Sequence, residues 1–292
     1  MTFSWFFGLL LLINQIQPPP LSINEEDETI TVIEREDILL RVPGLEVIDP
    51  VKYEELLNQI DQQIEKKPVN ATISDSGMII QEKVGHKLNR NAFTKKVYQY
   101  FYEKNPSVIE VPKIYYYPKV DSELLSMIRT KRIGQYITYF NAYKKSRAKN
   151  IALAAESINN KVLFPGEVFS FNKVVGIRTE DRGYMKAPEI VKGELIEGIG
   201  GGICQVSSTL FNAVDRSGLT IIERYSHSKH VPYVPPGRDA TVSWYGPDFT
   251  FRNDYNQPIL IRAQAIHGKM IVIIYSSEDI NFEPRNVQSV PR

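Results

Sequence analysis

The feature that most constrains the fold of this chain is a run of three glycines at residues 200–202, followed at once by an apolar pattern. Glycine adopts backbone angles that other residues avoid, so the run predicts a sharp turn that lets the backbone approach a ligand closely. Beyond it, apolar side chains recur at helical spacing, namely at Ile203, Val206, Leu210 and Val214. We therefore predict a buried helix that begins near Ile203.

Cys204, the single cysteine of the chain, falls in the first turn of this predicted helix. Free N–H groups and the positive end of the helix dipole favour a thiolate at that position, and the thiolate is the nucleophilic form of cysteine. The alternative is that Cys204 is a small, buried and unreactive side chain, as free cysteines usually are.

The composition is that of an ordinary globular protein. Of the 292 residues, 42% are hydrophobic and 24% are charged, which fits one or two domains. A formal net charge of +1 gives no general attraction to nucleic acid, so we expect no nucleic acid partner. A single cysteine also excludes an internal disulfide.

An apolar stretch over residues 3–13 is short for a membrane span but has the length of the apolar part of a signal peptide. No Lys or Arg precedes it and no clear small-x-small cleavage site follows it, so an uncleaved membrane anchor fits as well. We expect residues 1–17 to be a signal peptide or N-terminal anchor that contacts the membrane. A buried N-terminal helix is the alternative.

The rest of the chain predicts an α+β fold in two parts. A proline triplet and an acidic stretch predict a solvated linker over residues 18–48. Residues 49–130 combine helical and strand patterns and predict an N-terminal α+β module. Residues 131–278 predict a β-rich α+β domain that contains the helix at the cysteine, and residues 279–292 form a tail.

Residues 129–149 are basic, with aromatic residues between the charges. Such a surface could bind an anionic polymer or a glycan. We favour a simpler interpretation, in which residues 133–140 form a strand with inward aromatic side chains and the charges form a solvated rim.

Downstream of the cysteine, His227 and then Asp239 complete a possible catalytic set. A base must take the thiol proton, and a carboxylate can hold the other nitrogen of the imidazole ring in the right tautomer. Two alternatives remain open. His227 and His230 could bind zinc together with Cys204 and Asp239, or Asp239 could merely pair with Arg238. We expect no metal and no cofactor.

Residues 164–277 resemble a VanW domain, a module named from glycopeptide-resistance gene clusters. The matching motifs are Phe164-Pro-Gly-Glu-x-Phe-Ser-Phe-Asn, Gly176-x-Arg-Thr, Arg182-Gly-Tyr, Gly200-Gly-Gly-Ile-Cys-Gln-Val-Ser, Glu223-Arg, His227-Ser, Tyr233-Val-Pro, Gly237-Arg-Asp-Ala-Thr-Val and Asp248-Phe-x-Phe-x-Asn. Residues 50–130 more weakly resemble the peptidoglycan-binding module that often precedes VanW domains. The sequence departs from the VanW pattern at Ser208, where Thr is usual, and at Phe211, where Tyr is usual.

The resemblance implies a cell-wall protein of a Gram-positive type of bacterium, at the extracellular face of the membrane or in the wall. Its partners would be peptidoglycan stem peptides and wall glycan. Some VanW-domain proteins have been linked to L,D-transpeptidase activity, so Cys204 would be the nucleophile, His227 the base and Asp239 the residue that orients it. The substrate-binding candidates on the matching motifs are Arg178, Arg182, Gly201, Gly202, Gln205 and Arg238.

The leading hypothesis is therefore a cysteine acyltransferase that cross-links peptidoglycan in the manner of an L,D-transpeptidase. The alternative is a non-catalytic peptidoglycan-binding or glycopeptide-resistance accessory protein, in which the glycine–cysteine segment is only a tight turn. A metal-dependent hydrolase is a third interpretation. Either Arg178 or Arg182 could bind a stem carboxylate, or could merely pair with acidic residues of its own loop.

Overall fold

The computed structural model describes residues 19–103, 107–191 and 194–290. They form two compact units with separate hydrophobic cores. The first unit contains the described residues up to Val69 together with Lys83–Pro118, and the second contains Asn70–Glu82 and the described residues from Lys119 onward. Both units mix helices and strands, so the predicted α+β class is confirmed.

The first unit is built on a small three-stranded sheet. Its strands are β1 (Leu21–Glu25), β2 (Glu28–Ile33) and β8 (Val108–Glu110), in the order β2-β1-β8. Two antiparallel strand pairs accompany it, formed by β3 (Leu39–Val42) with β4 (Leu45–Ile48), and by β7 (Gly85–Leu88) with β9 (Lys113–Tyr116). A 3-10 helix, Arg35–Ile38, connects β2 to β3.

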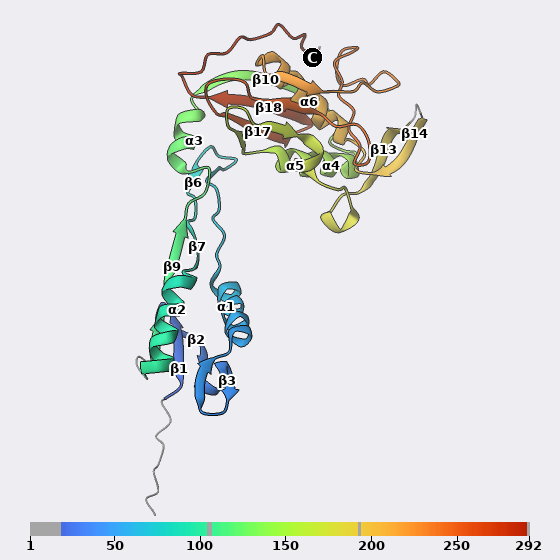
Figure 1. The fold of residues 1–292 in the computed structure, drawn as a ribbon. Helices are drawn as coiled ribbons and strands as arrows, with labels where there is room; N and C mark the ends of the chain where they lie inside the picture. The colour runs from blue at the N-terminus through green and yellow to red at the C-terminus, as the bar shows by residue number, and fades with distance from the viewer. Residues whose placement is uncertain (1–18, 104–106, 192–193, 291–292) are drawn as a thin grey trace, which may run out of the picture. The chain divides into compact units, whose positions relative to one another are not determined.

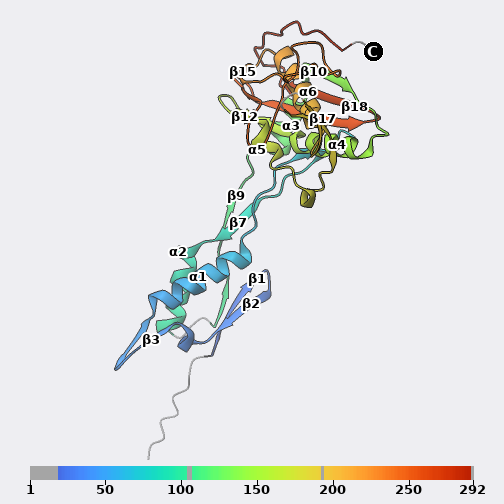
Figure 2. The same ribbon diagram turned by 90° about the vertical axis from the view of Figure 1, so that its right-hand side faces the viewer.

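Two helices complete this unit, α1 (Pro50–Ile64) and α2 (Arg90–Tyr98), the latter continued by a π-helical turn over Gln99–Glu103. The side chain of Asp49 caps α1 by accepting from the Val51 N–H at 2.9 Å, and Pro50 suits the first helical position. The apolar face of α1 is buried in one cluster with residues of α2, β1, β2 and β8. Figure 2 shows α1 lying beside β1 and β2.

The predicted linker over residues 18–48 is wrong, because most of this segment forms strands. Leu21 and Ile23 alternate with polar residues, and both are fully buried in the core of the first unit. The acidic stretch is the turn between β1 and β2, where Glu26 and Asp27 adopt positive φ angles of 53° and 69°. The composition suggested a solvated segment, but the alternation of side chains decides the structure.

The predicted boundary at residue 130 also differs from the structure. The hairpin of β5 (Thr72–Ile73) and β6 (Ile79–Ile80) and the helix α3 (Ser122–Ile128) belong to the second unit. Their apolar side chains form one buried cluster with Leu260.

The centre of the second unit is a four-stranded antiparallel sheet with the order β10-β18-β17-β11. Its strands are β10 (Lys131–Tyr139), β11 (Lys161–Leu163), β17 (Ile259–Ile266) and β18 (Lys269–Ser276). Two helices, α4 (Lys145–Ile158) and α6 (Ile203–Arg216), pack against this sheet, with α6 on β10 and β18 and α4 on β17 (Figure 1). The predicted helix start at Ile203 is thus confirmed.

Smaller elements surround this centre. β12 (Val168–Ser170), β16 (Thr250–Arg252) and β15 (Thr220–Glu223) form a second sheet, and β13 (Lys186–Val191) pairs with β14 (Glu194–Ile199) just before the glycine run. The short helix α5 (Phe171–Val175) and a 3-10 turn, Glu180–Arg182, lie between β12 and β13 in sequence. No helix in the described part of the chain is long and apolar enough to cross a membrane, and the apolar stretch 3–13 lies outside the described residues.

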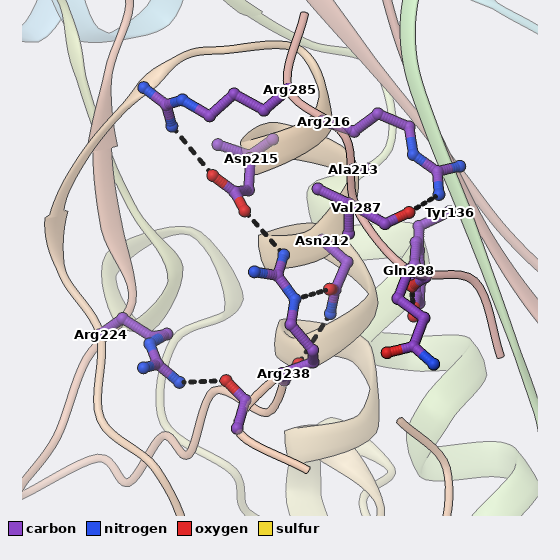
Figure 3. A network of polar contacts seen from close by, with 12 residues as sticks. Tyr136, Asn212, Ala213, Asp215, Arg216, Arg224, Arg238, Arg285, Val287 and Gln288 are labelled. Carbon is purple, nitrogen blue, oxygen red and sulfur yellow. Dashed lines mark hydrogen bonds and ion pairs between the residues drawn. The ribbon is translucent and has the colours of Figure 1, made fainter. Parts of the chain in front are cut away.

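The predicted tail is not a loose end, although its described part contains no helix or strand. Val287 is buried in the core of the second unit, and its carbonyl accepts a hydrogen bond from Arg216 at 2.5 Å. The hydroxyl of Tyr136 donates to the Gln288 carbonyl at 2.8 Å, and Arg285 pairs with Asp215 at 2.9 Å (Figure 3). The C-terminal segment therefore covers one end of α6 and fastens it to β10.

The close packing of α6 on β10 gives a test of this fold. A β-carbon on Gly134 would overlap the Ala213 carbonyl oxygen of α6, whereas a β-carbon on Gly246 would lie 3.6 Å from its nearest neighbour, on Ser243. We expect Gly134→Ala to lower the free energy of unfolding by about 1–3 kcal/mol, because overpacking moves the helix off the strand. Gly246→Ala is the matched control and should change it by less than about 0.5 kcal/mol in urea unfolding. Equal effects of both substitutions would contradict this packing.

Candidate functional site

The glycine run forms a buried turn between β14 and α6 that only glycines can make. Gly200 and Gly202 have φ angles of +94° and +109°, and a β-carbon on Gly201 would overlap the backbone of Ala187 in β13. Asn150 of α4 fixes this turn, because its side-chain amide donates to the Gly201 carbonyl at 3.0 Å and to the Met185 carbonyl at 2.8 Å. The start of α6 is therefore held against two other elements.

Cys204 is the second residue of α6 and is partly buried. The N–H groups on either side of it are occupied, since Ile203 donates to the Gly200 carbonyl at 3.1 Å and Gln205 donates to the Gly202 carbonyl at 3.0 Å. Within the described residues, the Cys204 N–H has no acceptor. It is thus a free donor at the positive end of a helix, next to the thiol.

The segment 238–242 runs along α6 and is fastened to it by polar side chains of the helix. The Ser207 hydroxyl donates to the Ala240 carbonyl at 2.6 Å, the Ala240 N–H donates to the Ser208 hydroxyl at 2.9 Å, and the Asn212 amide donates to the Arg238 carbonyl at 2.7 Å. These three side chains are fully buried, so each needs such a partner. The bonds set the register that brings this segment to the cysteine, and the Val242 carbonyl lies 3.5 Å from the Cys204 sulfur.

His227 and Asp239 form a tight pair. The Asp239 carboxylate lies 2.6 Å from the imidazole Nδ1 and also accepts from the His227 backbone N–H at 2.6 Å. The two side chains are only 4% and 9% exposed. With the carboxylate as acceptor, the proton sits on Nδ1, which leaves Nε2 as the nitrogen for proton exchange.

The pKa shifts connect this pair to the cysteine. Burial would raise the pKa of the Cys204 thiol, but the effect of His227, with smaller effects of Val242 and Thr241, outweighs burial and lowers that pKa below the ordinary value. Burial would lower the pKa of His227, but Cys204 and Asp239 together raise it. Burial would likewise raise the pKa of Asp239, and its bonds to His227 lower it. All three directions favour a thiolate, an imidazolium and a carboxylate side by side.

The other expected site residues differ in how close they lie to the glycine turn and in how exposed they are. Gly201 and Gly202 lie in the turn, and Gln205 is buried, where its amide donates to the Thr138 hydroxyl at 3.0 Å and to the Tyr139 carbonyl at 2.9 Å. Gln205 therefore contacts protein rather than an open surface. Arg182 is exposed and donates to the Ile177 carbonyl at 2.6 Å.

Arg238 is not brought to the cysteine. Its guanidinium pairs with Asp215 at 2.7 Å and donates to the Asn212 side chain at 2.8 Å, near the C-terminal end of α6 (Figure 3). Asn212 is about two turns beyond Cys204, or about 12 Å along the helix, and Asp215 is about 16 Å along it. Arg238 thus anchors the segment that carries Asp239 instead of reaching the thiol.

Nothing in the described part of the chain is arranged as a metal site. His230 is exposed, and no three His, Cys, Asp or Glu side chains among those residues are grouped to hold an ion.

Two residues at the site were missed from the sequence. Arg147 of α4 was interpreted as part of the solvated rim, yet it is partly buried and donates to the Gln205 side chain at 2.8 Å. Its spacing to Ile151, Ala154 and Ile158 puts it on the buried face of the helix, which was the available signal. Tyr233 is the second, and burial beside the charge of Cys204 raises its pKa above the ordinary value of a tyrosine.

The lowered pKa of the thiol can be tested directly. We expect alkylation of Cys204 by iodoacetamide to reach half its maximal rate below pH 8.5, the ordinary pKa of cysteine being about 8.5. In His227→Gln the midpoint should rise, because the partner that lowers the pKa is lost and burial still raises it. His230→Gln is the control and should leave the midpoint unchanged. The same midpoint in wild type and His227→Gln would contradict the thiolate–imidazolium pair.

Comparison with known proteins gives two family matches. Residues 146–275 match the family described as "VanW like protein", and residues 17–110 match the family described as "Putative peptidoglycan binding domain". The second match covers the whole segment 18–48 that was expected to be a linker, in agreement with the strands found there.

Two curated proteins are similar. The "Uncharacterized protein YoaR" of Bacillus subtilis (strain 168) is 55% identical over 285 residues, which cover 97% of this chain and 94% of that protein. The "Vancomycin B-type resistance protein VanW" of Enterococcus faecalis (strain ATCC 700802 / V583) is 36% identical over 117 residues, 38% of this chain and 42% of that protein. No solved structure matches the chain.

Proposed function

Since the chain belongs to the VanW-like proteins, with a domain of the peptidoglycan-binding type before the VanW-like part, we propose that it is a cysteine acyltransferase of the cell wall. Its substrate is a peptidoglycan stem peptide, and its reaction is that of an L,D-transpeptidase. The observation that carries this proposal is Cys204 in the first turn of α6, with its pKa lowered by a histidine that a buried carboxylate holds in place.

The first half of the reaction forms a thioester. The Cys204 thiolate attacks the carbonyl carbon of the amide before the terminal D-residue of the stem. The tetrahedral intermediate then collapses: the carbon–nitrogen bond breaks, and the His227 imidazolium gives its Nε2 proton to the departing amine. Asp239 keeps the ring in the orientation that this transfer needs.

The charge on the intermediate needs a donor that is not already bonded. Of the N–H groups in the first turn of α6, the Cys204 N–H meets this requirement within the described residues. It therefore supports an oxyanion site at the helix start, where the helix dipole adds to the stabilisation.

The second half of the reaction releases the acyl group. An amine of a neighbouring stem attacks the thioester carbon, and the now neutral His227 takes the proton that the amine loses. The sulfur leaves as a thiolate, the new amide is the cross-link, and the imidazolium is restored. If water attacks in place of the amine, the same proton transfers give carboxypeptidation.

The proposed thioester can be detected by mass. We expect the full chain, incubated with purified disaccharide-tetrapeptide, to gain the mass of this compound minus the mass of the free amino acid that leaves. Cys204→Ala should show no adduct, because the sulfur forms the new bond. Intact-mass spectrometry makes the measurement, with the thiol reduced and the fold checked by circular dichroism. If the folded wild type forms no adduct and leaves the muropeptides unchanged, the wall-binding alternative replaces the enzyme.

The assignment of the base gives a second test. We expect His227→Ala to lower the rate of thioester formation by about 10²- to 10⁴-fold, the usual contribution of a positioned acid or base. His230→Ala should leave the rate nearly unchanged, because its side chain is exposed. The reverse ranking of these two variants in the same mass assay would show that His227 is not the base.

A further inference from the structure

We propose that Arg147 and Arg178 form a carboxylate-binding pair beside Cys204, so that the peptide cut there must end in a free carboxylate at the residue that leaves. This inference rests on the proposed function and defines its substrate: the enzyme removes a terminal residue and does not cut an interior bond.

The side chains of both arginines lie against the glycine turn. A β-carbon on Gly200 would lie 3.3 Å from the Arg178 side chain, and one on Gly202 would lie 3.0 Å from the Arg147 guanidinium. Gly200 and Gly202 are two residues apart, which is at most about 7 Å of chain. Cys204 follows Gly202 by two residues, and its charge acts on both arginines.

Neither guanidinium has an acidic partner. Arg147 donates to the Gln205 amide oxygen at 2.8 Å, and Arg178 donates to the Asn172 amide oxygen at 2.8 Å. Among the described residues, neither arginine takes part in an ion pair. The Nη1 atom of Arg178 is buried and has no hydrogen-bond partner in that part of the chain.

The charge of one carboxylate, Asp248, acts on Arg178, but the oxygens of this carboxylate already accept hydrogen bonds from other groups. Asp248 acts on Arg178 only through its charge, while its oxygens accept from the Ser170 hydroxyl at 2.5 Å, the Asn172 N–H at 2.9 Å and the Phe249 N–H at 2.7 Å. It therefore holds the loop around Asn172 and leaves the guanidinium without an acid.

A carboxylate suits this arrangement better than a neutral group. Burial lowers the pKa of both arginines, because a cation removed from water without a counter-ion is destabilised. A guanidinium binds a carboxylate through two parallel N–H bonds, and such charged bonds are the strong ones. Both residues are partly exposed.

The position beside the thiol identifies the carboxylate. In a peptide, the terminal carboxylate lies one residue beyond the last amide carbonyl, or about 3.6 Å further along an extended chain. A carboxylate held by the arginines therefore puts this last amide, and no earlier one, at the Cys204 sulfur. Arg182 stays outside the pair, because it is exposed and bonded to the Ile177 carbonyl.

The first experiment compares two stem peptides. We expect the full chain to form the thioester about 10- to 100-fold faster from a disaccharide-tetrapeptide with a free terminal carboxylate than from the same compound as a carboxamide. In Arg147→Gln and Arg178→Gln this ratio should approach one. Arg132→Gln, which removes an exposed arginine whose side chain donates to Gln135, should keep the wild-type ratio. Equal rates from acid and amide in wild type would overturn the pair while leaving the acyltransferase intact.

A second experiment needs no peptide substrate. Iodoacetate and iodoacetamide alkylate the same sulfur, which displaces iodide in both cases, but only iodoacetate carries a carboxylate. We expect the ratio of their rates at Cys204 to fall about tenfold in Arg147→Gln and in Arg178→Gln, and to stay unchanged in Arg132→Gln. Arg178→Lys, which keeps the charge, should recover part of the ratio.

The neutral reagent also serves as a folding control, because a misfolded variant would change both rates. If none of these substitutions changes the ratio of the iodoacetate rate to the iodoacetamide rate, the proposed pair is wrong. A ratio that falls as expected in a protein that never forms a thioester would support the anion site and reject the acyltransferase.

Discussion

The candidate site depends on one set of hydrogen bonds, those that fasten segment 238–242 to the buried helix α6. Ser207, Ser208 and Asn212 would each be a costly unpaired group inside the core, and each is satisfied by the backbone of this segment. The bonds fix the segment in one register, and that register decides where Asp239 lies and therefore how His227 is oriented. The polar residues of an otherwise apolar helix thus position the chemistry rather than perform it.

The second constraint acts at the start of the same helix. The glycine turn is pressed against the backbone of β13 and held by Asn150, while Gly134 allows β10 to approach the C-terminal end of α6 closely. Both ends of the helix are therefore fixed, and the proposed carboxylate site of Arg147 and Arg178 adjoins the glycine turn at its start. In the proposed site, the His227 imidazolium and the two arginines carry three positive charges, and the Cys204 thiolate and the Asp239 carboxylate balance two of them. The remaining positive charge is what an anionic substrate would neutralise.

The VanW-like family, the α+β class and the helix at the cysteine could all be predicted from the sequence. The predictions that proved wrong are those in which the composition of a segment counted for more than the periodicity of its apolar residues. Leu21 and Ile23 alternate as a strand does, but the neighbouring prolines and acidic residues suggested a linker. Arg147 lies on the apolar stripe of α4, but the basic residues around it suggested a solvated surface. The described part of the C-terminal segment has no helix or strand, so no periodic pattern in the sequence could indicate that Val287 is buried.

The sequence by itself determined what is local. Three glycines and a 3.6-residue pattern require a turn followed by a helix, and these properties depend only on neighbours in the chain. Only the tertiary structure decided which distant side chains meet. Arg147 contacts Gln205 across 58 positions, and Arg238, next to Asp239 in sequence, turns to Asp215 instead of the thiol. Such contacts depend on how two elements pack together, which neither element encodes alone.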